Sequence, residues 1–311
     1  MLYKINMTRM LWGAQNSLPL DKPARSVPRE LLVFLLVAMI VSLCQSVVLS
    51  LVQVPLMLAD PEYYKLISNP DISSEEITKY SISFTENLPP WVNALTLFLS
   101  IFMIIAALFY CKKYEKRKAY TLGFTSRGFV VEYLLGMVIG AVMISLPVLA
   151  CLLTKCVSFS LSAPIDPLII ILYFLAFLVQ GLGEEALFRG YLLTSLARRK
   201  NIWLAITVSS LMFSFFHIGN NSFSVIAFIS IFLFGIFASV FMLKRGSIWA
   251  VGAIHAMWNF DQGNILPFFP YHQIMKCLQS RVLLFVVLDA LIDAREAAHG
   301  MNQLQSVKTK P

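Results

Sequence analysis

Residues 31–58 read LLVFLLVAMIVSLCQSVVLSLVQVPLML and contain no Asp, Glu, Lys or Arg. A helix needs roughly 20 residues to cross the ~30 Å hydrocarbon core of a bilayer, so this run is long enough to form a transmembrane helix. The whole chain has the same character, since 58% of its 311 residues are hydrophobic and 14% are charged. A soluble domain of this size would expose much of that apolar surface to water. The sequence therefore predicts an all-α integral membrane protein.

Further apolar runs follow the first. The predicted spans lie at about 31–58, 91–111, 129–153, 167–196, 203–217, 225–243 and 248–260. An eighth span is left open, because the last apolar run (282–292) is short and carries Asp289. The fold class expected is therefore a polytopic bundle of about seven to eight transmembrane helices.

The positive charges follow the same pattern as the spans. Lys and Arg gather in the N-terminal 30 residues and at 112–118, 198–200 and 244–245, whereas the loop at 60–90 is mainly acidic. Cytoplasmic loops of membrane proteins carry such an excess of Lys and Arg, which predicts a cytoplasmic N-terminus. The net charge of +8 is thus explained without nucleic acid, which we do not expect as a partner. The five cysteines form no CxxC or Cys/His pattern, so no disulfide framework or zinc knuckle is indicated.

The first candidate motif is GEEALFRG at 183–190, late in the fourth predicted span. Ionisable residues inside a span are costly and are usually functional. On a helix, Glu185 and Arg189 lie four residues apart and can pair. Glu184 points about 100° away from Glu185 and is free to act as a general base. A structural ion pair at a helix end explains the same residues without catalysis.

Two further motifs follow on later spans. The segment FSFFH at 213–217 ends the fifth span with His217, and HAMWN at 255–259 places His255 and Asn259 on one helix face. Hydrogen-bond donors on such a face can stabilise an oxyanion or orient a water molecule. Taken singly, these residues also fit a packed histidine and polar contacts between helices.

The three motifs together are more specific than each alone. Glu-Glu-x-x-x-Arg, Phe-x-x-x-His and His-x-x-x-Asn, in this order on three separate spans, resemble the CPBP family of intramembrane proteases. That family includes CAAX prenyl endopeptidases and bacteriocin-processing enzymes and is also called the abortive-infection family. The resemblance covers roughly residues 170–264. It implies that Glu184 activates the attacking water and that His217 assists it.

The resemblance also implies roles for the remaining motif residues. Glu185 and Arg189 would shape and balance the site, and His255 and Asn259 would stabilise the tetrahedral oxyanion. The family label is metalloendopeptidase, and its members have been described both as metal-dependent and as using glutamate alone. The chain has no His-Glu-x-x-His motif, so standard zincin geometry is absent. We expect a metal-independent glutamate mechanism, with a divalent metal such as zinc as the alternative cofactor.

The expected organisation is one membrane domain flanked by short segments. Residues 1–30 form a basic cytoplasmic segment, and residues 31–265 form the transmembrane protease domain with its motif core at 170–264. Residues 266–311 hold the undecided last span and a polar tail, whereas relatives usually finish with an apolar helix.

The function predicted from these observations is CAAX-type or bacteriocin-processing cleavage of a peptide bond near or within the membrane. The expected partners are membrane lipid and a peptide or membrane-anchored protein substrate, and the expected location is the cell membrane. A non-enzymatic peptide-binding or bacteriocin-immunity protein is the alternative. A proton-relaying transporter is disfavoured because the sequence contains no inverted repeat.

Overall fold

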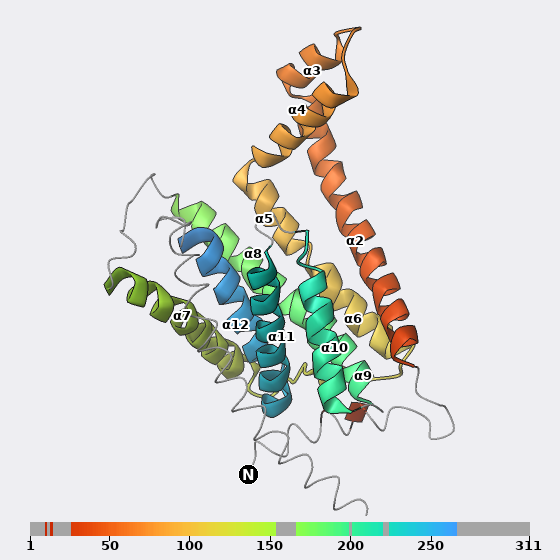
Figure 1. The fold of residues 1–311 in the computed structure, drawn as a ribbon, viewed down its shortest axis with the longest axis vertical. Coiled ribbons are helices and arrows are strands. Elements are labelled where there is room, and N and C mark those ends of the chain that lie inside the picture. The colour runs from red at the N-terminus through yellow and green to blue at the C-terminus, as the bar shows by residue number, and fades with distance from the viewer. Residues whose placement is uncertain are drawn as a thin grey trace, which may run out of the picture.

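A computed structural model describes residues 10, 13–14, 26–153, 166–198, 201–219 and 224–265 (Figure 1). The regular structure of these residues is helical and includes no strand, which confirms the predicted all-α class. The elements in chain order are α2 (Val27–Leu58), α3 (Pro61–Ile67), α4 (Ser74–Glu86), α5 (Pro90–Phe98), α6 (Ile101–Lys113), η1 (Ala119–Leu122), α7 (Phe129–Leu153), α8 (Pro167–Glu185), the π-helix η2 (Ala186–Leu193), α9 (Thr194–Ala197), α10 (Ile202–Phe215), α11 (Val225–Arg245), α12 (Trp249–Phe260) and the π-helix η3 (Asp261–Ile265).

Five of the described helical segments are long and apolar enough to cross a membrane by length and composition. They are Val27–Leu58, Pro90–Lys113, Phe129–Leu146, Pro167–Ala197 and Val225–Arg245. The fifth and seventh predicted spans form shorter helices, because α10 has 14 residues and α12 has 12. Most residues of α12 are buried by the protein, so this helix meets its neighbours rather than lipid. The prediction of seven or eight spans is therefore correct only roughly, and the candidate eighth span lies outside the described residues.

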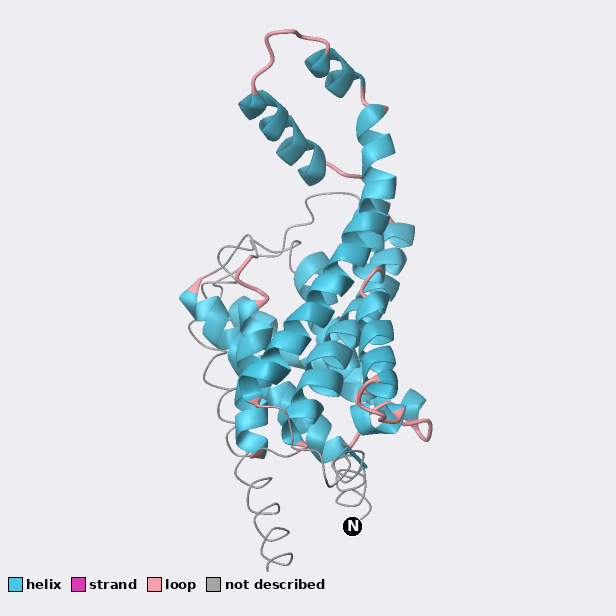
Figure 2. Cartoon of the chain, turned by 90° about the vertical axis from the view of Figure 1, so that its right-hand side faces the viewer, coloured by secondary structure: helices cyan, strands magenta, loops and turns pink. Residues whose placement is uncertain are grey.

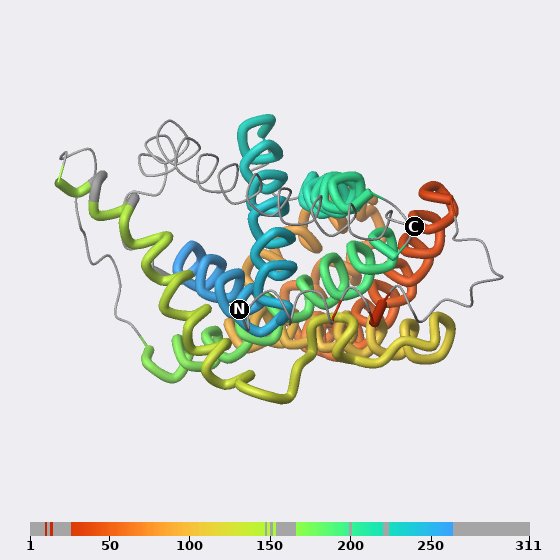
Figure 3. Tube along the Cα trace, turned by 90° about the horizontal axis from the view of Figure 1, so that it is seen from below, coloured from red at the N-terminus to blue at the C-terminus, as the bar shows by residue number. Residues whose placement is uncertain are grey.

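The two ends of the bundle differ in charge. Lys112 and Lys113 end α6, and Lys244 and Arg245 end α11, all at the end that also holds α9 (Figure 1). The acidic segment with α3 and α4 projects from the opposite end (Figure 2). Figure 3 views the bundle from the basic end, with α2 and α7 on opposite sides. The described basic clusters thus share one end of the molecule, as the predicted topology requires.

A close crossing of α8 and α12 brings the motif residues together. A Cβ atom added to Gly181 on α8 would lie 2.5 Å from the Ala256 nitrogen and 2.8 Å from the Gly252 oxygen, both on α12. Small residues at such crossings let helix backbones approach closely within a membrane. The same close approach occurs between Gly140 of α7 and Ile254 of α12. The central α12 is therefore held between α7 and α8 by contacts that only small residues allow.

Replacing Gly181 with Ala is expected to destabilise the protein by about 1–3 kcal/mol, because the added methyl group overpacks against the α12 backbone. The measurement is the thermal unfolding temperature of the purified protein in detergent. Gly219→Ala is the matched control, since a Cβ at Gly219 meets no atom within 4 Å. Equal unfolding temperatures for the two variants would contradict the close crossing.

A buried polar cluster fixes the basic end of the helical segment that begins with α8. Arg117, in the loop after α6, pairs with Glu115 at 2.7 Å and donates to Thr194 at 2.6 Å and Ser195 at 2.9 Å. Glu115 also pairs with Arg198 at 2.9 Å. Because Thr194 and Ser195 lie on α9, this cluster joins the loop to the helix that continues from α8 through η2.

Candidate active site

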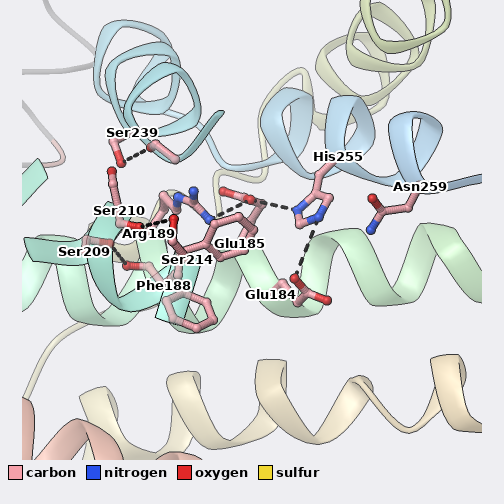
Figure 4. A network of polar contacts seen from close by, with 12 residues as sticks. Glu184, Glu185, Phe188, Arg189, Ser209, Ser210, Ser214, Ser239, His255 and Asn259 are labelled. Atoms are coloured by element: carbon pink, nitrogen blue, oxygen red, sulfur yellow. Dashed lines mark hydrogen bonds and ion pairs between the residues drawn. The ribbon is translucent and has the colours of Figure 1, made fainter. Parts of the chain in front are cut away.

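Three helical segments converge on one buried polar cluster (Figure 4). Glu184 and Glu185 end α8, and Arg189 follows in the π-helix η2. His255 lies on α12, which crosses α8 one turn before the two glutamates. His217 lies just after the end of α10, where its backbone N–H donates to Ser214.

The Glu185 side chain is fully buried and contacts both Arg189 and His255. Its Oε1 accepts from Arg189 Nη1 at 3.0 Å and lies 2.9 Å from His255 Nδ1. The Arg189 guanidinium also lies over the Phe213 ring, 4.1 Å from its centroid. A cation above an aromatic face is stabilised by the ring quadrupole. The structure thus contains the ion pair expected between Glu185 and Arg189, and adds His255 as a further partner of the same oxygen.

Glu184 directs its two carboxylate oxygens to different neighbours. Its Oε1 accepts a hydrogen bond from Gln180 Nε2, one helical turn earlier on α8. Its Oε2 lies 3.8 Å from His217 Nε2 and 3.7 Å from His255 Nε2. Among the described residues, this buried Oε2 has no hydrogen-bond partner. Both distances are too long for direct hydrogen bonds. The two imidazoles thus neighbour the same carboxylate oxygen without bonding to it directly.

The orientation of both imidazole rings follows from their Nδ1 partners. His217 Nδ1 lies 2.7 Å from the Phe213 carbonyl oxygen, and His255 Nδ1 lies 2.9 Å from Glu185 Oε1. Carbonyl and carboxylate oxygens only accept hydrogen bonds, so we assign a proton to Nδ1 of each ring. In a neutral ring Nε2 is then an acceptor. The position between Glu184 Oε2 and His217 Nε2 therefore suits a molecule that donates two hydrogen bonds, as water does.

Asn259 reaches the cluster indirectly. Its Nδ2 donates to Gln180 Oε1 at 3.0 Å, and Gln180 in turn donates to Glu184. The sequence prediction placed Asn259 and His255 on one helix face, and both lie on the side of α12 that meets α8 (Figure 4). The prediction did not include Gln180. Its only sequence signal is a polar residue four positions before Glu184 in an apolar run.

The cluster contains carboxylate and imidazole groups, which bind zinc in proteins, but the separations between them differ from those of zinc ligands. Ligands about 2.1 Å from a tetrahedral zinc lie roughly 3.4 Å from each other. The two imidazole Nε2 atoms are 3.7 Å and 3.8 Å from Glu184 Oε2, and Glu185 is engaged with Arg189 and His255. Among the residues that the structure describes, no group of three or more His, Cys, Asp or Glu side chains is placed to hold a metal ion. These distances do not fit the metal of the family label, and no step below is assigned to one.

An apolar helix bundle that encloses a carboxylate, two imidazoles and an ion pair defines a polytopic membrane protein with an acid–base site. Residues 166–260 match the family described as type II CAAX prenyl endopeptidase Rce1-like. This segment is therefore similar to CAAX-type intramembrane proteases of the CPBP family, the family that its three motifs predicted. The matched segment contains Gln180 and all six predicted site residues. Comparison with curated proteins finds no match for the chain.

Proposed function

We propose that the protein is an intramembrane endopeptidase in which Glu184 activates a water molecule for attack on a peptide bond. The observation that carries this proposal is the buried Glu184 Oε2, which finds no hydrogen-bond partner in the part of the chain that the structure describes and lies 3.8 Å and 3.7 Å from Nε2 of His217 and His255. Glu184 Oε2 and His217 Nε2 are two acceptors that can orient a water through its two hydrogen atoms and leave its lone pair for the substrate carbonyl.

The proposed reaction has two proton transfers. The water oxygen bonds to the carbonyl carbon while one water proton moves to Glu184 Oε2, and the carbonyl oxygen becomes an oxyanion. Glu184 then gives this proton to the amide nitrogen, and the carbon–nitrogen bond breaks to release an amine and a carboxylic acid, which passes its remaining proton to the amine. His217 holds the water through Nε2 during the first step.

The oxyanion needs donors on the α12 side of the site. Asn259 uses one amide N–H for Gln180 and retains a second for another acceptor. We assign the same role to His255, whose ring is held by Glu185 and can donate through Nε2 when protonated. Glu185 and Arg189 thus act by orienting His255 and balancing charge.

The site lies inside the apolar helical segment Pro167–Ala197, which α8 begins and η2 and α9 continue. Glu184 is 17 residues after Pro167, which is roughly 26 Å along a helix at 1.5 Å per residue. We therefore propose a substrate that enters the membrane region, such as a peptide precursor or a membrane-anchored protein. The proposed location is the cell membrane, with the basic end and the N-terminus in the cytoplasm.

The test compares protein and peptide termini in cells that carry the wild type or Glu184→Gln at matched protein levels. New termini found only with the wild type would support the protease and identify its substrate. Identical termini in both, together with a retained phenotype in the variant, would overturn the proposal in favour of a peptide-binding or bacteriocin-immunity protein.

A further inference from the structure

Gln180 lies between Glu184, the proposed base, and Asn259, a proposed oxyanion donor. From its place on α8, its amide nitrogen donates to Glu184 Oε1 on the same helix, and its amide oxygen accepts from Asn259 Nδ2 on α12 at 3.0 Å. It is partly buried, and the crossing at Gly181 holds α12 against it. One side chain thus contacts both the proposed base and a proposed oxyanion donor.

The direction of this chain of hydrogen bonds is fixed by chemistry. An ionised carboxylate only accepts, so the amide nitrogen of Gln180 must face Glu184. The amide oxygen of Gln180 then faces α12, where it can only accept, so Asn259 must present its amide nitrogen. Gln180 therefore determines the orientation of the Asn259 amide as well as that of the Glu184 carboxylate.

The bond to Gln180 also separates the two oxygens of Glu184. With Oε1 held by the amide, Oε2 is the oxygen that faces the two imidazoles. Without this bond the carboxylate can rotate about its last single bond, since such terminal torsions are broad. A base must lie within hydrogen-bond reach of the proton that it removes, so this rotation would reduce its efficiency.

We propose that Gln180 is a positioning residue that aligns the Glu184 carboxylate with the water and the Asn259 amide with the oxyanion. This inference rests on the proposed function and extends it to a residue outside the three motifs. Residues that orient catalytic groups through hydrogen bonds commonly contribute a factor of about 10–100 in activity.

The decisive variants are Gln180→Met and Gln180→Glu, tested on the substrate that the termini comparison identifies. Gln180→Met keeps the length of the side chain and removes both hydrogen bonds, so cleavage per folded molecule is expected to fall about 10–100-fold at every pH. A protonated Glu at this position reproduces both bonds, because its O–H donates to Glu184 and its carbonyl accepts from Asn259. Its ionised form removes the donor and repels Glu184.

Gln180→Glu is therefore expected to cleave nearly as well as the wild type at low pH and to lose activity relative to the wild type as pH rises. The titratable groups that face Glu184 are His217, after α10, and His255, on α12. Glu185 and Arg189 follow on its own helix, α5 carries no titratable side chain, and those of α6 lie in its last turn. The wild type and Gln180→Glu share all of these groups. The pH dependence of the ratio of their cleavage rates therefore reports the ionisation of residue 180.

The matched control is Gln45→Met. Gln45 of α2 donates to the Leu99 carbonyl oxygen at 3.0 Å, so this variant also removes a partly buried interhelical hydrogen bond. It is expected to leave cleavage per folded molecule unchanged. A merely structural Gln180 would likewise change the amount of folded protein and not the rate per folded molecule. Wild-type rates in Gln180→Met, or a Gln180→Glu ratio that is constant with pH, would overturn the proposal.

A second measurement does not depend on cleavage. The thermal unfolding temperature of Gln180→Glu is expected to fall relative to the wild type as pH rises, and the added Glu184→Gln substitution is expected to remove this fall. A fall that persists in the double variant would show that position 180 does not face Glu184 and would also overturn the proposal. Absence of cleavage by the wild type would instead count against the proposed function, so the two failures are distinguishable.

Discussion

Glu184→Gln is expected to reduce peptide-bond cleavage by at least about 10²–10⁴-fold, the range that a positioned general base contributes. The glutamine amide has the same shape but cannot take a proton from the water. The folded protein should persist at wild-type levels, because the substitution removes a buried charge whose Oε2 accepts no hydrogen bond from any described residue. The measurement is the single-turnover rate on the identified substrate, normalised to folded protein.

The control for this variant is Glu132→Gln. Glu132 of α7 also lies in a helix of the bundle, but it pairs with Arg245 of α11 and not with the site. Cleavage per folded molecule should be unchanged in this control. A Glu184→Gln rate within a factor of about three of the control would exclude Glu184 as the base.

Arg189→Met is expected to lower the free energy of unfolding by about 3–5 kcal/mol, because it leaves the fully buried Glu185 without its cationic partner. Methionine fills much of the space of the arginine stem, so the loss reports charge more than a cavity. The measurement is thermal or denaturant unfolding in detergent. Arg127→Met, at an exposed position in the loop before α7, is the control and should be close to neutral.

A double variant separates pairing from packing in this region. Two of the three guanidinium nitrogens of Arg189, Nε and Nη2, have no hydrogen-bond partner among the residues that the structure describes, so the buried ion pair is itself costly. Replacing both charges, as in Glu185→Gln with Arg189→Met, should recover most of the stability lost by Arg189→Met alone. Further destabilisation in the double variant would show that the loss comes from packing instead.

The class of fold was predictable because a long apolar run has few stable structures other than a transmembrane helix. Residues 31–58 form α2, and the runs near 91–111 and 225–243 correspond to α5–α6 and α11. The run at 203–217 corresponds to the short apolar helix α10, and the run at 248–260 forms α12, most of which is buried by the protein. The sequence did not reveal this burial, because hydropathy does not distinguish contact with lipid from contact with protein. The π-helix after Glu185 also had no signal in the sequence, since its wider hydrogen bonding is set by the packing of η2 against α6 and α10.

The candidate site was predictable where polar residues interrupt apolar spans. The structure brings Glu184, Glu185, Arg189, His217 and His255 into one cluster, while their catalytic roles remain proposals. The pairing of His255 with Glu185 depends on how α12 crosses α8, and residue spacing along one helix cannot show it. Gln180 was missed for the same reason, because only the crossing reveals that its amide connects two helices.

Oxygen-isotope labelling tests the central claim, that Glu184 activates water and does not itself attack the peptide bond. The experiment is a single turnover of the identified substrate in water enriched in oxygen-18, followed by mass measurement of the product and of the peptide that contains Glu184. Direct attack by water places one heavy oxygen in the new carboxylate of the product and none in Glu184. Heavy oxygen in Glu184 together with an unlabelled product would show a covalent anhydride and contradict the account.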